Sequence, residues 1–244
     1  MPTKKPRRTF DRILEVTLAL FNRFGEPNVS TNQLCGELGI SPGNLFYHHP
    51  TRDALVLGLF AQYQSALQVA LAENASAYAS SMPAHAPWLE GGSAPLNQLA
   101  WLCHDLAQVA WTYRFLFRDL SDLVSRHRAL EEGLPPLMQQ QAAALMAALR
   151  QQAWQAEDAD VNALKLWTGP MLATLTGCMA LDGVMDPRER LRNNEDKVIR
   201  RAVGLALGLI RPSLRAPDRA MLGRHLARSD QLGSDPWWLL PAES

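Results

Sequence analysis

The stretch VSTNQLCGELGISPGNLFYHHPTRDAL, residues 29–55, decides the fold. It predicts two short helices joined by a glycine turn, followed by the start of a third helix. Ser30 is suited to cap the first helix, and Gln33, three positions later, completes the pattern of a capping box. Gly39 supplies the positive φ that ends this helix and turns the chain. Such a pair can be ordinary core, but here the caps, the turn glycine and the apolar spacing all agree.

The second helix of this pair has the composition of a helix that reads bases. Ser41 caps it, and Pro42 takes its first position, where the missing N–H costs nothing. Two helices joined in this way form a helix-turn-helix motif, whose second helix enters the major groove of DNA. Asn44 carries an amide that can read a base edge, adenine best of all. Tyr47 and His48 can donate hydrogen bonds to phosphates.

Two further features add positive charge next to the motif. Thr51 caps a third helix whose first turn holds Arg52, a cation that we expect to contact the DNA backbone. Residues 1–12 hold five basic residues and one acidic residue, a net charge of +4. A basic arm of this kind suits phosphate or minor-groove contacts, although a solvated terminus without a role has the same composition. The predicted DNA-binding residues are Ser30, Thr31, Asn32, Pro42, Gly43, Asn44, Phe46, Tyr47, His48 and Arg52.

The rest of the chain also predicts helices. Apolar residues recur with a period of 3.6 and no long stretch alternates with a period of two, so the fold class is all-α. A helix from Thr51 to about Tyr78 links the motif to the remainder, and residues 80–95 form a loop. Pro135 and Pro136 indicate that the helix of residues 131–156 begins after them. Further helices are expected at about residues 9–24, 95–113, 115–125, 156–181, 188–210 and 217–227.

This pattern predicts three successive parts. Residues 1–52 form a helix-turn-helix domain with its basic arm. Residues 53–228 form a second helical domain, and residues 229–244 form an irregular tail.

Composition excludes several classes of protein. The 244 residues have no net charge, so the molecule as a whole does not attract nucleic acid. Three distant cysteines give neither a disulfide framework nor a zinc pattern, which favours a reducing cytoplasm. The longest apolar run, residues 202–210, cannot span a bilayer. There is no metal spacing, nucleophile elbow or phosphate loop, so we expect no enzyme, no catalytic or metal-binding residue, no cofactor and no membrane.

Residues 8–60 resemble the TetR-type transcriptional regulators. The resemblance rests on Thr9–Glu15, Leu20-Phe21, Gly25, Ser30-Thr31, Cys35-x-x-x-Gly39-Ile40-Ser41, Gly43–His48 and Arg52–Leu55. Two positions depart from the family pattern, in which a tyrosine usually stands at Phe46 and a phenylalanine at His49. The resemblance implies an operator of palindromic double-stranded DNA, a homodimer and an effector pocket in the second domain.

Bulky side chains on the middle helices are the candidates for that pocket. As single residues they are ordinary core, but as a group they can line an apolar cavity. Arg114 and Arg118 can pair with an anionic head group or, equally, with Asp119 and Asp122. The pocket candidates are Trp101, His104, Trp111, Arg114, Phe115, Trp167 and Met171.

Several segments further resemble the TetR-type regulators of polyhydroxyalkanoate gene clusters. This narrower resemblance implies a fatty-acid derivative as effector, such as an acyl thioester of coenzyme A. It rests on Phe21-Asn22, Gly25–Thr31, Ile40–Leu45, Leu57–Phe60 and Tyr113–Ser121.

An apolar stripe near the C-terminus predicts the dimer contact. Val198, Ala202, Leu205 and Leu209 share one helix face, and the glycine pair 204/208 permits close helix approach. With the resemblance, the last two core helices are expected to form a four-helix dimer interface.

The sequence therefore predicts a cytoplasmic, homodimeric DNA-binding regulator controlled by a small apolar or amphipathic effector. The alternative is a ligand-binding or interaction protein of the same fold with weakened DNA binding, which Phe46 and His49 favour. Whether DNA binding represses or activates depends on where the operator lies relative to the promoter.

Overall fold

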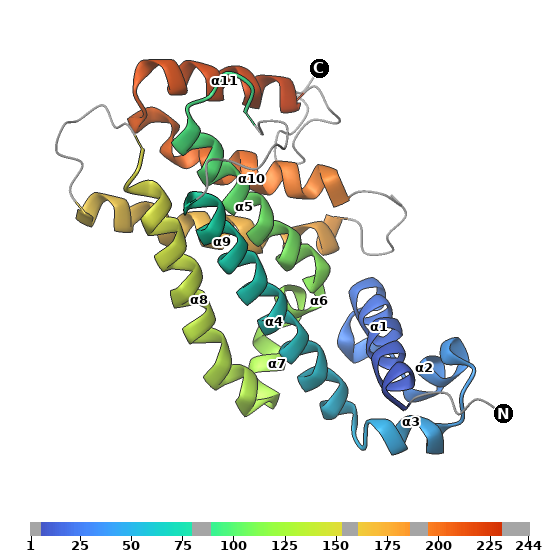
Figure 1. The fold of residues 1–244 in the computed structure, drawn as a ribbon. Helices are drawn as coiled ribbons and strands as arrows, with labels where there is room; N and C mark the ends of the chain where they lie inside the picture. The colour runs from blue at the N-terminus through green and yellow to red at the C-terminus, as the bar shows by residue number, and fades with distance from the viewer. Residues whose placement is uncertain (1–5, 80–88, 153–160, 186–194, 231–244) are drawn as a thin grey trace, which may run out of the picture. The chain divides into compact units, whose positions relative to one another are not determined.

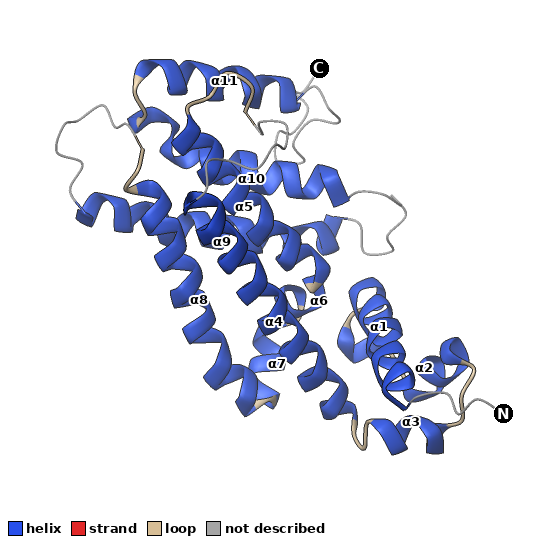
Figure 2. Ribbon diagram, viewed as in Figure 1, coloured by secondary structure: helices blue, strands red, loops and turns tan. Residues whose placement is uncertain are grey.

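The computed structural model describes residues 6–79, 89–152, 161–185 and 195–230, and these are helical with short connections (Figures 1 and 2). This confirms the predicted all-α class. The elements are α1 (Pro6–Phe24), η1 (Glu26–Asn28), α2 (Thr31–Leu38), α3 (Pro42–His48), α4 (Arg52–Ala79), α5 (Ala94–Thr112), α6 (Arg114–Arg118), α7 (Leu120–Arg126), α8 (Arg128–Leu149), α9 (Val161–Met185), α10 (Glu195–Ile210), η2 (Arg211–Ser213) and α11 (Ala216–Asp230).

The chain forms two compact units that are not continuous in sequence. One unit contains residues 1–68, 109–138 and 179–192, and the second contains residues 69–108, 139–178 and 193–244. The first unit thus joins the helix-turn-helix segment to the first part of α4 and to α6 and α7. Contacts therefore divide the chain differently from the three successive parts expected from sequence. Most of the expected tail, residues 231–244, lies outside the described residues.

The local signals of the helix-turn-helix operate as predicted. The Ser30 hydroxyl accepts the backbone N–H of Gln33 at 3.1 Å, and Gly39 ends α2 with φ 65°. The Ser41 hydroxyl accepts the N–H of Asn44 at 3.3 Å at the start of α3. The Thr51 hydroxyl caps α4 through the N–H of Ala54 at 3.1 Å. The apolar faces of these helices are buried by Ile13, Phe21, Val29, Leu34, Leu38, Leu45, Leu55 and Leu59.

A buried carboxylate fixes the turn between α1 and α2. Glu26 is 1% exposed, with Arg52 Nε 2.6 Å from Oε1 and Arg126 Nη2 2.5 Å from Oε2. Asp122 holds the same Arg126 nitrogen at 2.6 Å. The backbone N–H of Glu26 donates to Asp119 Oδ2 at 3.0 Å. One side chain therefore ties η1 to the start of α4 and to α7.

The end of α1 is fastened to the same region by backbone-directed hydrogen bonds. Asn22 donates to the carbonyl of Thr112 at 2.8 Å and accepts the N–H of Phe115 at 3.1 Å. Arg118 donates to the carbonyl of Phe21 at 2.9 Å. The rings of Phe21 and Phe115, both fully buried, lie 5.4 Å apart. These bonds satisfy polar groups that the apolar contact removes from water.

The expected start of α8 was wrong. The helix begins at Arg128, and Pro135 and Pro136 lie inside it on its exposed side. The buried stripe of Leu130, Leu134 and Leu137 runs straight through the prolines, so packing outweighs the backbone hydrogen bonds that they remove. Gly133 of α8 also allows close packing, because its missing side chain leaves room for the Phe60 ring of α4.

One helical segment in the described part of the chain, Arg52–Ser76 of α4, is long and apolar enough to cross a bilayer, with a mean hydropathy of 1.4. A core helix passes the same test, and a third of this segment is already buried within the protein. By itself the segment is weak evidence for a membrane.

Two glycines that differ in their surroundings provide a matched test of the packing. A Cβ at Gly133 would lie 2.8 Å from Cε1 of the Phe60 ring, whereas a Cβ at Gly36 would meet nothing within 4 Å. We expect Gly133→Ala to destabilise the protein by about 1–2 kcal/mol through overpacking. Gly36→Ala should stabilise it by about 0.5–1 kcal/mol through helix propensity. Urea unfolding checks both; equal effects would contradict the close contact.

The Glu26 carboxylate predicts a stability change in acid. Burial alone would raise the pKa of Glu26, but the hydrogen bonds and charges of Arg52 and Arg126 outweigh burial and hold it below 4.5. The charged form therefore stabilises the fold above about pH 4.5, and this contribution is lost as the pH falls through the folded pKa. We expect Glu26→Gln to lower the free energy of unfolding by about 2 kcal/mol at pH 7, because it leaves both guanidinium groups without their carboxylate. The loss is moderate because both guanidinium groups are partly exposed to water.

The control is Glu132→Gln, which breaks the exposed Arg128–Glu132 pair and should change stability by less than about 0.5 kcal/mol. The difference in free energy of unfolding between wild type and Glu26→Gln should also be smaller at pH 4 than at pH 7. Parallel pH profiles would mean that Glu26 does not hold the turn through its charge.

Candidate nucleic-acid interface

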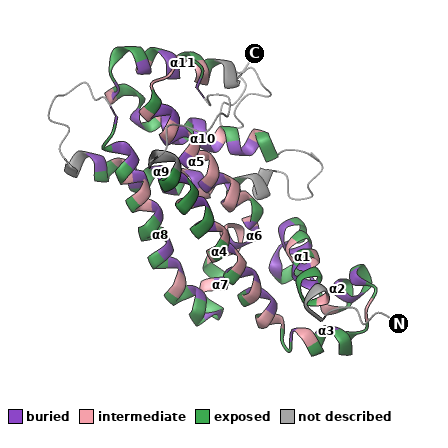
Figure 3. Ribbon diagram, viewed as in Figure 1, coloured by how far each residue is buried: buried purple, intermediate pink, exposed green. Residues whose placement is uncertain are grey.

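The predicted reading surface is assembled by the ends of α2 and α3. Leu34, Cys35 and Leu38 of α2 and Leu45 of α3 are buried, whereas most of α3 is exposed (Figure 3). Half-buried positions are Thr31, His48 and Arg52. Exposed positions are Ser30, Asn32, Pro42, Gly43, Asn44, Phe46 and Tyr47.

The outer face of α3 offers both a reader and a phosphate donor. Asn44 is exposed on the first turn, which is where a recognition helix contacts base edges. Tyr47 is 79% exposed, and its ring meets that of His48 edge-on at 5.1 Å. Phe46 is 44% exposed and presents an apolar ring where a tyrosine would add a hydroxyl.

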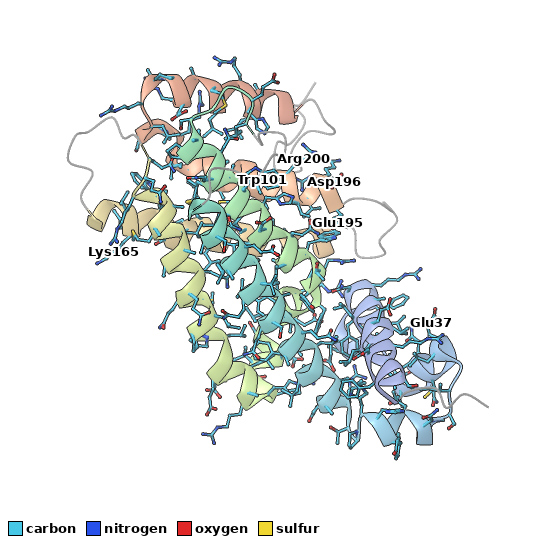
Figure 4. The ribbon with its side chains drawn as sticks, viewed as in Figure 1. Glu37, Trp101, Lys165, Glu195, Asp196 and Arg200 are labelled. Carbon is cyan, nitrogen blue, oxygen red and sulfur yellow. The ribbon has the colours of Figure 1, made fainter. Side chains whose placement is uncertain are left out.

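This surface carries no cation of its own. Residues 31–48 contain no lysine or arginine and one acidic residue, Glu37, which is exposed on α2 (Figure 4). Positive charge for phosphate contacts therefore has to lie outside residues 31–48, as in the basic arm of residues 1–12. Arg7 and Arg8 belong to the first turns of α1, while Lys4 and Lys5 lie outside the described residues.

The structure gives Arg52 partners inside the chain, and its phosphate contact stays a prediction. Its guanidinium binds the Glu26 carboxylate at 2.6 Å and also donates to the carbonyls of Glu26 and Val29. A cation whose donors are engaged inside the domain is a poor partner for DNA. The place of Arg52 next to the motif suggested a phosphate contact, but the sequence could not show that Arg52 pairs with the buried Glu26.

His49, which replaces the usual phenylalanine, is buried at the end of α3. The residue is 3% exposed, and its backbone N–H donates to the carbonyl of Leu45 at 2.9 Å. The imidazole stacks on Phe10 of α1, with ring centroids 4.3 Å apart. Nε2 is buried without a hydrogen-bond partner. Burial lowers the pKa of His49, opposed by a hydrogen bond to the Phe10 backbone and assisted by the charge of His48.

The seven predicted pocket residues do not fall in one compact unit. Trp111, Arg114 and Phe115 belong to the first unit, and the other four to the second. Phe115 is fully buried core, and the Arg114 guanidinium lies 4.3 Å above the Trp111 ring. Arg114 also donates to the Trp111 carbonyl at 3.2 Å. Asp122, one of the carboxylates considered for Arg114 and Arg118, pairs with Arg126.

A polar group in the second unit was missed from sequence. The Asp105 carboxylate accepts a hydrogen bond from Asn74 of α4 at 2.6 Å and lies 3.1 Å from Nδ1 of His104. The centroid of the His104 ring lies 5.3 Å from that of the Trp101 ring. Asn74 is 8% exposed, and a polar residue on the apolar side of α4 was the available signal. Trp167 is half-buried and Met171 fully buried on α9.

The predicted dimer stripe is divided by the structure. Val198 and Ala202 are buried inside the chain and cannot contact a second copy, whereas Leu205 and Leu209 are 39% and 41% exposed. A Cβ at Gly204 would lie 3.2 Å from Leu226, so this glycine serves the approach of α11 within the same chain. The spacing of apolar residues along one helix could not show whether that face packs against the same chain or against a second copy of it.

Nothing in the described part of the chain resembles a catalytic centre. No cluster of three or more His, Cys, Asp or Glu residues there could hold a metal ion. All three cysteines are buried, and burial raises the pKa of Cys103 to about 12, which keeps the thiol protonated and unreactive.

Comparison with known proteins identifies the family. Residues 13–59 match the family of bacterial regulatory proteins called tetR, and residues 77–222 match the TetR family of bacterial transcriptional repressors. No curated protein matches the chain.

Solved structures share the fold at low sequence identity. A TetR-family transcriptional regulator from Marinobacter aquaeolei VT8 is 21% identical, with a TM-score of 0.69 over 93% of this chain and 99% of that one. The ketosteroid transcriptional regulator KstR2 of Mycobacterium tuberculosis is 14% identical, with a TM-score of 0.56 over 84% and 95%. A regulator from Saccharomonospora viridis in complex with choline is 18% identical, with a TM-score of 0.53 over 84% and 96%. Because the second of the two sequence matches covers more than half of the chain, this protein belongs to the TetR family of DNA-binding transcriptional regulators.

Proposed function

We propose that this regulator acts in the cytoplasm as a homodimer, binds a palindromic operator through α3, and responds to a small apolar or amphipathic effector. The observation that supports DNA reading is the exposed face of α3, with Asn44 on its first turn and the opposite side held by the buried Leu45. Two such helices separated by roughly 34–36 Å would meet successive major grooves. An effector that binds one spacing better than another would shift the population between them.

The surface of α9 supports the homodimer. Along this helix Leu166 is 73% exposed, and Gly169, Pro170 and Ala173 are exposed at helical spacing on the same side. A Cβ at Gly169 or at Gly177 would meet nothing within 4 Å, so these small residues leave room for a close neighbour. An uncharged helix face of this kind is typical of a buried interface. On α10, Leu205 and Leu209 are also exposed.

The effector is proposed to bind in the second unit. Trp101, His104 and Asp105 supply aromatic and polar groups there, and Trp167 adds a second indole. The solved structures of similar fold include the ketosteroid transcriptional regulator KstR2 and a regulator in complex with choline, so this fold accommodates small molecules. A fatty-acid derivative, including an acyl thioester of coenzyme A, rests on the sequence resemblance to polyhydroxyalkanoate regulators.

A second candidate is a ligand-responsive protein of the same fold with weak DNA binding. The absence of lysine and arginine from residues 31–48 favours it, because phosphate neutralisation supplies much of the affinity for DNA. A DNA selection experiment separates the two.

Purified protein should select an inverted repeat from a randomised duplex library. Asn44→Ala should then relax base preference at one position of each half-site, by about 1–3 kcal/mol of discrimination. Tyr47→Phe is the matched control, because loss of a phosphate-directed hydroxyl should weaken all sequences alike. Recovery of no enriched sequence would favour the second candidate, and an unchanged Asn44→Ala profile would remove Asn44 as a reader.

The α9 face predicts a dimer that a single charge can dissociate. Leu166→Glu should convert the dimer to a monomer, because a carboxylate would be buried without a partner. Met138→Lys is the control, since Met138 is also exposed but is followed by the exposed Gln139 and Gln140. Native mass spectrometry measures both and also reveals any retained effector mass. A Leu166→Glu protein that stays dimeric would exclude this face.

A further inference from the structure

A titratable ring anchors the reading helix at the position where the family usually has phenylalanine. His49 is the residue that ends α3, with φ −133° and ψ 94°, so its backbone leaves the helix at this point. Its side chain returns to the core and stacks on Phe10 of α1 at an interplanar angle of 26°. The α3 helix has seven residues, and Leu45 is its buried apolar side chain. The histidine ring is therefore the second fixed point of a short helix, at the end opposite the Ser41 cap.

The surroundings of the His49 ring disfavour its protonated form. Nε2 is buried without a partner, and the whole residue is 3% exposed. Protonation would create a buried N–H donor and a positive charge with no acceptor, which is costly in an apolar setting. The imidazolium would have to reach water, which removes the stack on Phe10 and releases the end of α3.

Neighbouring charges do not offset this cost. Among the nearby groups, His48 is the one whose charge acts on the ring, and it also disfavours protonation of His49. The Arg52 guanidinium is held by Glu26. The other carboxylates and cations of α1 to α4 whose burial is described are exposed: Asp11, Arg12, Glu15 and Arg23 on α1, Glu37 on α2, and Asp53 and Glu73 on α4.

We infer that His49 is a positioning residue for α3 and that its neutral ring is required for the helix to dock on DNA, so that operator binding weakens in mild acid. The inference rests on the proposed DNA-reading function. It assigns to this chain a proton-dependent control that a phenylalanine at position 49 would lack. Because His49 is at the end of α3 and contacts α1, its effect on DNA is indirect.

Protonation of His49 disfavours the docked position of α3, so operator binding should weaken as the pH falls. The histidine pKa is depressed in the folded state, so the neutral ring is intact above about pH 6.5 and is lost as the pH falls through the folded pKa.

The test compares wild type with His49→Phe on the inverted-repeat duplex recovered in the library selection. At pH 8 the two proteins should bind within about twofold, because phenylalanine keeps the ring stack. The affinity of wild type should hold from pH 8 to about pH 6.5 and then fall toward pH 5.5, at a slope of up to about tenfold per pH unit, the limit for one linked proton. His49→Phe should hold or gain affinity over the same range. His225→Gln, a substitution on α11, should keep the wild-type profile.

A readout without DNA completes the test. In ¹H–¹⁵N spectra of the free protein, the amide signals of Gly43–Leu45 should move with one common titration in wild type and lose it in His49→Phe. Identical pH profiles for both proteins, in binding or in the spectra, would overturn the inference and leave His49 as ordinary core. Absence of DNA binding at pH 8 by both proteins would instead overturn the proposed function, while the spectra would still decide the role of His49.

Discussion

The buried carboxylate of Glu26 holds the helix-turn-helix segment in place. Glu26 is shared by Arg52 at the start of α4 and Arg126 of α7, and its backbone binds Asp119. Two guanidinium groups around one buried carboxylate leave little freedom in the turn that precedes α2. The orientation of the reading helices therefore depends on α7 as much as on their own short cores. A change in α7 would be transmitted to this turn through a charge that cannot be left unpaired.

This arrangement explains why the first compact unit is discontinuous in sequence. A helix-turn-helix of about fifty residues has a small core, and small cores provide little stability alone. The hydrogen bonds of Asn22 and the Phe21–Phe115 contact enlarge that core with residues almost a hundred positions away. The reading head is thus completed by the region that follows α5.

Local signals predicted the motif well, because they act over three or four residues. The caps at Ser30, Ser41 and Thr51 and the turn at Gly39 could be read from the sequence. The partners of Arg52, the burial of Val198 and Ala202, and the helical environment of Pro135 could not, since each depends on a distant neighbour. The exposed face of α9 was missed for the converse reason: a helix that is apolar on all sides gives no periodic signal. Which residues touch DNA or an effector remains a prediction.

The uncharged reading surface has a consequence for how such a protein searches a genome. Random DNA retains a protein mainly through counterion release at phosphates, and residues 31–48 contribute no lysine or arginine to that term. A larger share of the molecules is then free rather than sequestered on non-cognate sequence. What matters in the cell is the ratio of operator binding to that background. A reader of this composition can keep an operator occupied at a low copy number, provided that its basic arm supplies just enough attraction to start the encounter.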